Sequence, residues 1–183
     1  MGTHRLTDDL CKILFSEEQI QARVAALGEA ISRDFADEGV VLVGILKGAV
    51  VFLADLARSI SVPVEMDFMA ISSYGRATKS TGVVRILKDL DRDITGRRVI
   101  IVEDIVDSGM SLSFLKDNLN SRGAKSISIC VLLDKPSRRR AHVDVDYCGF
   151  EVPDEFVVGY GLDYAERYRE LPMIGVLKPE VYQ

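Results

Sequence analysis

The sequence predicts an α/β protein whose core is a parallel sheet with helices on both sides. Apolar runs of strand length alternate with amphipathic helical patterns, which is the strand-helix-strand order of this class. The runs are apolar on both faces, as in residues 99–102, and such strands are covered by helices on each side of a sheet. With 183 residues, 48% of them hydrophobic, the chain has the size of one domain and can fill one core.

The periodicity of apolar residues places the elements in order. Ser16 and Gln19 have the spacing of a helix capping box, and apolar residues then recur every three or four positions up to Phe35. Gly123 can end a later helix whose apolar face has the same spacing. We find no repeat or linker that indicates a second domain. The expected elements are a helix after Ser16, a strand at 40–46, a turn at 47–48, a helix at 49–60, a strand after Pro63, strands at 83–87 and 99–102, a helix from about 112 to 123 and a strand at 126–133.

The composition narrows the classes of protein to consider. No apolar run approaches the length of about 18 residues that a membrane span needs, and the N-terminal MGTHRLTDDL lacks the layout of a signal peptide. We therefore expect a cytoplasmic protein with no membrane partner. The net charge of -5 and the pI near 5.1 disfavour a protein that coats nucleic acid. The three cysteines and two histidines are far apart or isolated, so neither a disulfide framework nor a thiolate zinc site is indicated.

The stretch VIIVEDIVDSGMSL at 99–112 joins a buried strand to acids and small residues. Its EDIVD part, 103–107, places three negative charges within five residues, and its SGMS part, 108–111, offers hydroxyls and open backbone just before a helical pattern. In open parallel sheets, ligands bind beyond the carboxyl ends of strands, where the next helix presents free N–H groups and a partial positive charge. The small residues therefore predict a phosphate site.

The acids beside this turn need a partner other than a phosphate. Negative side chains would repel a phosphorylated ligand, so sugar hydroxyls and a divalent metal are the natural partners of Glu103 and Asp104. The ligand implied has a phosphate at one end, a sugar in the middle and a metal near the sugar, as in a phosphorylated ribose. A surface turn with incidental acids remains the alternative at this point. The triplet Arg138–Arg140 is expected in a solvated loop rather than in a phosphate patch.

The stretch at 99–112 closely resembles the phosphoribosyl pyrophosphate signature of the type I phosphoribosyltransferases. Four further segments resemble the hypoxanthine-guanine branch of that family, and the resemblance spans nearly the whole chain. These segments are GILKG at 44–48, Ser73-Tyr74, DKPSRR at 134–139 and PDEFVVGYGLDYAERYREL at 153–171. The resemblance implies a glycosyltransferase of purine salvage that joins hypoxanthine or guanine to phosphoribosyl pyrophosphate, giving IMP or GMP and pyrophosphate, with Mg2+ as cofactor.

The family also implies an architecture. A central, mostly parallel sheet flanked by helices would carry a small hood, built from N-terminal and C-terminal segments, within a single domain at 1–183. The chain would act on small molecules, without a nucleic-acid partner, as a homodimer or homotetramer. The polar loop at about 72–82 would be a mobile lid that excludes water from the reaction, with Ser73 and Tyr74 as its binding residues.

Matching the motif residue by residue implies a set of phosphoribosyl pyrophosphate contacts. Asp107 matches the residue near the imidazole ring of the base, where a carboxylate can accept the proton that the purine sheds, so it is the expected general base. In this family the turn at Lys47 contains a cis peptide bond before the lysine. The expected phosphoribosyl pyrophosphate ligands are Leu46, Lys47, Gly48, Ser73, Tyr74, Glu103, Asp104, Asp107, Ser108, Gly109, Met110, Ser111 and Arg169.

The resemblance implies a separate set of purine contacts. Lys135 matches the lysine that donates to the exocyclic oxygen of the base, and Phe156 matches the aromatic residue that stacks on it. Pattern alone would instead predict an exposed Lys135 and a core Phe156. The backbone of Val157 would contact the purine edge, and Asp163, beside the purine, would bind a second magnesium through water. The implied metal ligands are Glu103, Asp104 and Asp163.

Two alternatives share the signature. A phosphoribosyltransferase for another base, such as xanthine or adenine, would bind the same sugar phosphate, although an adenine enzyme should lack the combination of Lys135, Phe156 and Asp163. A regulator that senses phosphoribosyl pyrophosphate would usually need an added DNA-binding segment or a basic face, and this acidic chain shows neither clearly. Dehydrogenase and P-loop classes are disfavoured because neither G-x-G-x-x-G nor G-x-x-x-x-G-K-[ST] occurs.

Overall fold

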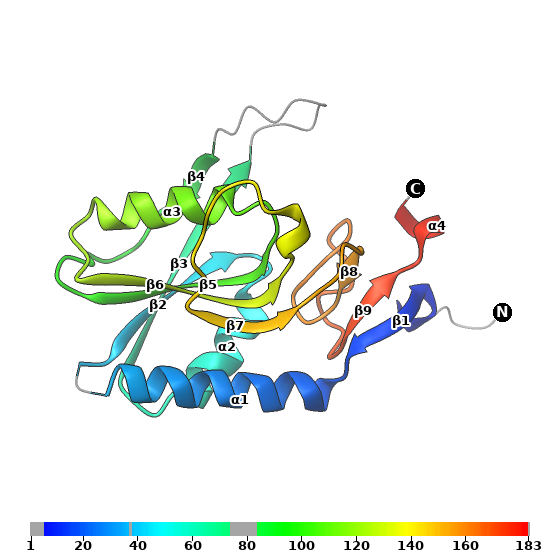
Figure 1. Cartoon of the computed structure of the whole chain (residues 1–183), viewed down its shortest axis with the longest axis horizontal. Helices are drawn as coiled ribbons and strands as arrows, with labels where there is room; N and C mark the ends of the chain where they lie inside the picture. The colour runs from blue at the N-terminus through cyan, green and yellow to red at the C-terminus, as the bar shows by residue number, and fades with distance from the viewer. Residues whose placement is uncertain (1–5, 37, 74–83, 183) are drawn as a thin grey trace.

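A six-stranded, mostly parallel sheet forms the centre of the protein. The computed structural model describes residues 6–36, 38–73 and 84–182. The strand order is β4-β3-β2-β5-β6-β7, and only β4 runs antiparallel to its neighbour (Figure 1). The strands are β2 (Val40–Leu46), β3 (Val64–Ser73), β4 (Val84–Lys88), β5 (Arg98–Val106), β6 (Ser126–Asp134) and β7 (Tyr147–Glu151).

Helices cover both faces of this sheet. The helices α1 (Glu17–Asp34) and α2 (Val50–Ser59) lie on one face, and α3 (Met110–Asn120) lies on the other (Figure 1). Successive residues of a strand point to opposite faces, so Leu42 packs with α1 and α2 whereas Val43 packs with α3. Both cores are apolar, which explains why the central strands are hydrophobic without alternation.

A second, smaller sheet joins the two ends of the chain. Its order is β1-β9-β8, and all its pairings are antiparallel. Its strands are β1 (Leu10–Phe15), β8 (Val157–Val158) and β9 (Ile174–Leu177), and short segments η1 (Leu6–Asp9), η2 (Pro136–Arg138) and α4 (Pro179–Tyr182) complete the described chain. This sheet stands beyond one end of the large sheet, close to the described N- and C-terminal segments, and corresponds to the expected hood (Figure 1).

Most expected elements of the large sheet are confirmed, with one difference that concerns the site. The strand expected at 99–102 continues to Val106 as β5, so Glu103 and Asp104 lie within a strand rather than after it. Pairing of β5 with β6 holds through these acids, since Glu103 lies opposite Val131 and Val106 opposite Asp134. The pattern did not predict β1, β7, β8 or β9. Across the described ranges, no helix combines the length and apolar character that crossing a membrane requires.

The expected capping box at the start of α1 is confirmed and can be tested. The Ser16 hydroxyl accepts from the Gln19 amide at 3.3 Å, and the Gln19 side chain accepts from the Ser16 amide at 2.9 Å. Ser16→Ala leaves one helix N–H without its side-chain partner, so we expect the free energy of unfolding to fall by about 0.5–2 kcal/mol. Urea denaturation measures it, and Glu29→Ala at an exposed position of the same helix is the control, expected within about 0.5 kcal/mol of wild type. Equal losses in both variants would contradict the assignment.

Candidate active site

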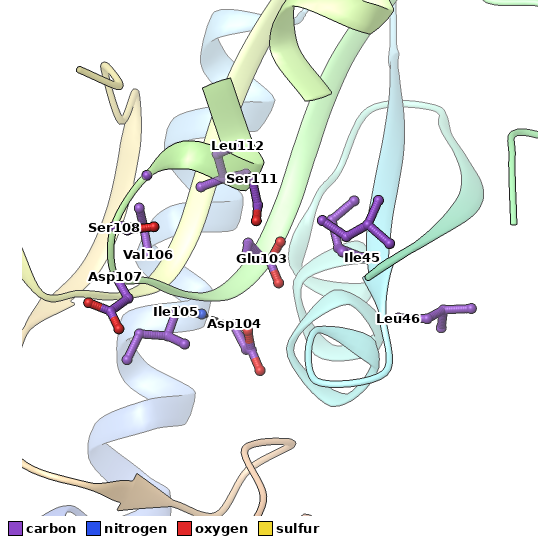
Figure 2. A pocket seen from close by; sticks show the side chains of 12 residues that line it. Ile45, Leu46, Glu103, Asp104, Ile105, Val106, Asp107, Ser108, Ser111 and Leu112 are labelled. Atoms are coloured by element: carbon purple, nitrogen blue, oxygen red, sulfur yellow. Dashed lines mark hydrogen bonds between the residues drawn. The ribbon is translucent and has the colours of Figure 1, made fainter. Parts of the chain in front are cut away.

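A cavity of about 310 Å³ opens at the carboxyl end of the large sheet. The end of β2, the end of β5 and the first turn of α3 surround it. Figure 2 shows Glu103 and Asp104 between β2 and the loop that leads into α3, with Asp107 and Ser108 farther along that loop. Because β2 and β5 are parallel neighbours, their carboxyl ends meet here.

The loop from Asp107 to Ser111, called here the 107–111 loop, presents open backbone at a helix N-terminus. Gly109 has φ of 79°, and α3 begins at the next residue, Met110. A Cβ atom at position 109 would lie only 2.8 Å from the carbonyl oxygen of Ala141, so only glycine fits both the backbone angle and the space. The Met110 amide donates to the Ser108 hydroxyl at 3.4 Å. The loop places the N-terminus of α3 and two serine hydroxyls beside the cavity, the arrangement that suits a phosphate group.

Two adjacent carboxyl groups face the same cavity. Glu103 and Asp104 are both half-buried, and burial raises the pKa of each. For Glu103, the neighbouring Asp104 charge raises the pKa further. The Ile105 amide donates to Asp104 at 2.8 Å and favours its charged form. A bound cation or a set of sugar hydroxyls would stabilise this pair of charges.

The turn after β2 packs tightly against these acids. The Leu46–Lys47 peptide bond is cis, as the family resemblance implied. A Cβ atom on Gly48 would overlap a carboxylate oxygen of Asp104, and a Cβ atom on Gly161 would overlap the carbonyl oxygen of Gly48. Three segments far apart in the sequence therefore meet at the acids, and two of them have no room for a side chain.

A second cavity, of about 250 Å³, shares a wall with the first. Asp104, Ile105 and Asp107 line both cavities, and Lys135 and Phe156 line only the second of the two. Leu162, Asp163 and Val157 of β8 complete its lining, and Leu162 is a residue that the sequence reasoning did not single out. Asp107 is exposed at the junction of the two cavities.

The pattern-based expectations for Lys135 and Phe156 are both wrong. Lys135 is only 8% exposed, and its ammonium donates to the Glu155 carbonyl at 2.9 Å. Phe156 is 38% exposed, and its ring stacks on Tyr182 of α4 with centroids 4.9 Å apart. A single partly exposed aromatic ring is common, but a buried lysine is unusual and requires a hydrogen-bond partner, here the Glu155 carbonyl.

Charged residues of the segment that follows β8 form ion pairs beside the turn at Lys47. Arg169 pairs with Asp163 at 2.8 Å, and Lys47 pairs with Glu166 at 2.9 Å. Within the ranges that the structure describes, no group of three or more His, Cys, Asp or Glu side chains is placed to hold a metal ion. The expected ligands Glu103, Asp104 and Asp163 therefore do not form a ready-made metal cage.

The triplet at 138–140 includes a contact that the sequence did not reveal. The Arg139 guanidinium pairs with Asp134 and lies 3.5 Å from the Asp107 carbonyl oxygen. The Arg140 and Ala141 amides donate to the Ser108 carbonyl at 2.9 and 3.0 Å. This segment therefore supports the 107–111 loop from outside, and no spacing rule could have indicated it. Of the expected lid at about 72–82, residues 74–82, and so Tyr74, lie outside the described residues, and Ser73 ends β3.

A family model described as a phosphoribosyl transferase domain matches residues 12–165, which is most of the chain. The chain belongs to the phosphoribosyltransferase family.

Three individual relatives resemble the chain over most of their length, and all three are named for hypoxanthine. The chain is 56% identical over 181 residues to a hypoxanthine-guanine phosphoribosyltransferase of Mycobacterium avium, with 96% of this chain and 89% of that protein covered. It is 55% identical over 175 residues to the protein of the same name in Bacillus subtilis, covering 96% and 97%. A crystal structure of a hypoxanthine phosphoribosyltransferase from Staphylococcus aureus superposes with a TM-score of 0.95 at 46% identity, covering all of both chains.

The close approach of Gly48 to Asp104 predicts a specific double-variant result. Gly48→Ala forces a methyl group onto the carboxylate, and overpacking of this kind costs about 1–3 kcal/mol of unfolding free energy. Asp104→Ala removes the obstructing oxygens, so the cost of Gly48→Ala in that background should fall below about 0.5 kcal/mol. Chemical denaturation of the four proteins measures both values. The same cost in both backgrounds would show that the strain lies elsewhere.

Proposed function

We propose that the chain transfers the phosphoribosyl group of phosphoribosyl pyrophosphate to hypoxanthine or guanine, giving IMP or GMP and pyrophosphate. It is an enzyme of the phosphoribosyltransferase class that acts in purine salvage. The observation that carries the proposal is the shared wall of the two cavities, since a sugar phosphate in one and a planar base in the other meet at Asp107. The relatives named for hypoxanthine and guanine disfavour both alternatives, another base and a sensing regulator.

The first cavity is proposed to hold phosphoribosyl pyrophosphate. The 107–111 loop would bind the 5-phosphate through free N–H groups and the hydroxyls of Ser108 and Ser111. Glu103 and Asp104 would hold the ribose hydroxyls. The turn of Leu46, Lys47 and Gly48 would bind the pyrophosphate together with Arg169, and Ser73 and Tyr74 would close over it.

The acids fit a magnesium ion. Mg2+ is usually bound by one or two carboxylates plus substrate phosphates and waters, so it does not need a complete cage of side chains. The half-buried pair Glu103 and Asp104 gives two such carboxylates, and burial already disfavours their paired negative charges. Asp163 is proposed to hold a second ion through water. A magnesium ion held by these carboxylates would supply positive charge beside the pyrophosphate.

The second cavity is proposed to hold the 6-oxopurine. The ammonium of Lys135 would donate to the exocyclic oxygen, Phe156 would stack on the ring, and the Val157 backbone would contact its edge. As the new bond forms between the base and the ribose carbon, the bond to pyrophosphate breaks and the imidazole ring loses its proton. Asp107, exposed at the junction, would accept that proton as general base.

The broader assignments follow the family. We propose that residues 1–183 form a single catalytic domain, that the hood sheet closes the base cavity, and that the protein assembles as a homodimer or homotetramer in the cytoplasm. The substrates are small molecules. Phe156, Val157 and α4 all belong to the hood or adjoin it, so the hood supplies the wall on which the base would stack.

A spectrophotometric assay with separate bases tests the proposed function. We expect nucleotide formation from hypoxanthine or guanine with phosphoribosyl pyrophosphate and Mg2+, and much slower formation from adenine, because Lys135 can donate to an oxo group but cannot accept from an amino group. Chelation of divalent ions should abolish turnover, and added Mg2+ should restore it. Preference for adenine, or full activity after chelation, would refute the proposal.

Asp107→Asn tests the proposed general base. The amide keeps the shape of the side chain but cannot accept the proton, so kcat should fall by about 10²- to 10⁴-fold. The affinity for phosphoribosyl pyrophosphate should change much less, because the 107–111 loop binds through its backbone and serine hydroxyls. Steady-state kinetics and calorimetric binding give the two values. A wild-type kcat would make Asp107 structural, and a collapse of affinity would make it a sugar-phosphate ligand.

A further inference from the structure

Glu166 lies between two cations and has no role in the proposal above. Its carboxylate is 2.9 Å from the Lys47 ammonium and 3.5 Å from the Arg169 guanidinium. The Lys47 ammonium, which donates a hydrogen bond to it, lowers the pKa of Glu166 and keeps it charged. Glu166 therefore touches both basic side chains that are proposed to bind pyrophosphate.

The backbone holds Glu166 in this place. Ala165 and Glu166 have φ of 51° and 64°, the left-handed region that residues with a Cβ rarely adopt. The Glu166 amide donates to the Asp163 carboxylate at 2.9 Å, and Tyr164 and Arg167 pair through their backbones at 3.2 and 3.1 Å. The turn thus directs Glu166 toward Lys47 through an unusual backbone conformation.

Arg169 is held in place by a backbone carbonyl and two carboxylates. Its Nη1 donates to the Gly161 carbonyl at 2.7 Å and its Nη2 meets Asp163, but its buried Nε has no hydrogen-bond partner among the residues that the structure describes. A buried N–H donor without a partner is costly. The terminal nitrogens of Arg169 are the atoms that meet the carboxylates of Asp163 and Glu166.

We infer that Glu166 is the internal counter-ion that pyrophosphate must displace, and that it lowers the affinity of the site for pyrophosphate. The inference rests on the proposed function of Lys47 and Arg169. Lys47 and Glu166 are about two-thirds exposed, so their ion pair is weak and can exchange readily with a phosphate. Glu166 keeps the two cations placed near the site when pyrophosphate is absent, and it competes with the product when pyrophosphate is bound.

The test compares neutral variants at position 166 with a matched control. Glu166→Gln removes the competing charge, and Glu166→Asn does the same with a residue that tolerates a left-handed backbone. Both should bind magnesium pyrophosphate about two- to fivefold more tightly in calorimetry at low salt, and pyrophosphate should inhibit their turnover correspondingly better. Glu170→Gln, an equal charge change at an exposed position nearby, should change affinity much less.

Two further comparisons, at different salt concentrations and in a Lys47→Met background, distinguish an electrostatic role of Glu166 from a structural one. Screening weakens exposed charge interactions, so the gain from Glu166→Gln should shrink as ionic strength rises from 0.01 to 0.5 M, taken as rough limits. The gain should also shrink when Lys47 is replaced by Met. Unchanged or weaker pyrophosphate binding in both 166 variants, or the same gain in Glu170→Gln, would overturn the inference. If the wild-type protein neither binds magnesium pyrophosphate nor forms nucleotide, the proposed function itself fails.

Discussion

Parallel pairing of β2 with β5, and of β5 with β6, decides where the polar groups of this protein can lie. The pairing places Val43 beside Ile101 and Ile101 beside Ile129, so the three strands end at one edge of the sheet. The turn at Lys47 and the segment at Lys135 follow those ends, and Glu103 and Asp104 lie in the last four residues of β5, so the three segments meet. No single side chain creates the site. The backbone register brings these segments together, and the apolar faces on both sides hold that register.

The acidic and the basic side chains at this end of the sheet have different surroundings. Glu103 and Asp104 are half-buried with raised pKa values, whereas Lys47 and Arg169 stand a short distance away, already paired with acids of the segment after β8. The acids with raised pKa values and the bases already engaged in ion pairs thus occupy separate parts of the site. A substrate with sugar hydroxyls, phosphates and an accompanying cation has complementary groups for both parts.

Sequence patterns predicted the centre of the large sheet well because its central strands are continuous apolar runs that can be recognised locally. Residues 40–46 are apolar throughout and form β2 with the same bounds. The end of β5 was missed because hydrophobicity stops at Val102 while backbone pairing with β6 continues to Val106. The hood could be predicted only from the family resemblance. Its strand β8 has two residues, and β1 pairs with β9, which lies near the opposite end of the sequence. The contact of Arg139 with Asp107 joins residues 32 positions apart, which local patterns cannot reveal.

The close approach of Gly48 to Asp104, and of Gly161 to Gly48, depends on the size of the side chains rather than on their charge. A Cβ atom on Gly48 would overlap the Asp104 carboxylate, and one on Gly161 would overlap the Gly48 carbonyl oxygen, so glycine at both positions lets these segments pack closely. Steric exclusion is indifferent to ionic strength and to protonation, whereas ion pairs such as Lys47 with Glu166 weaken in salt. Higher ionic strength should therefore weaken the exposed ion pair of Lys47 with Glu166, whereas the close packing of Gly48 and Gly161 near the acids should persist.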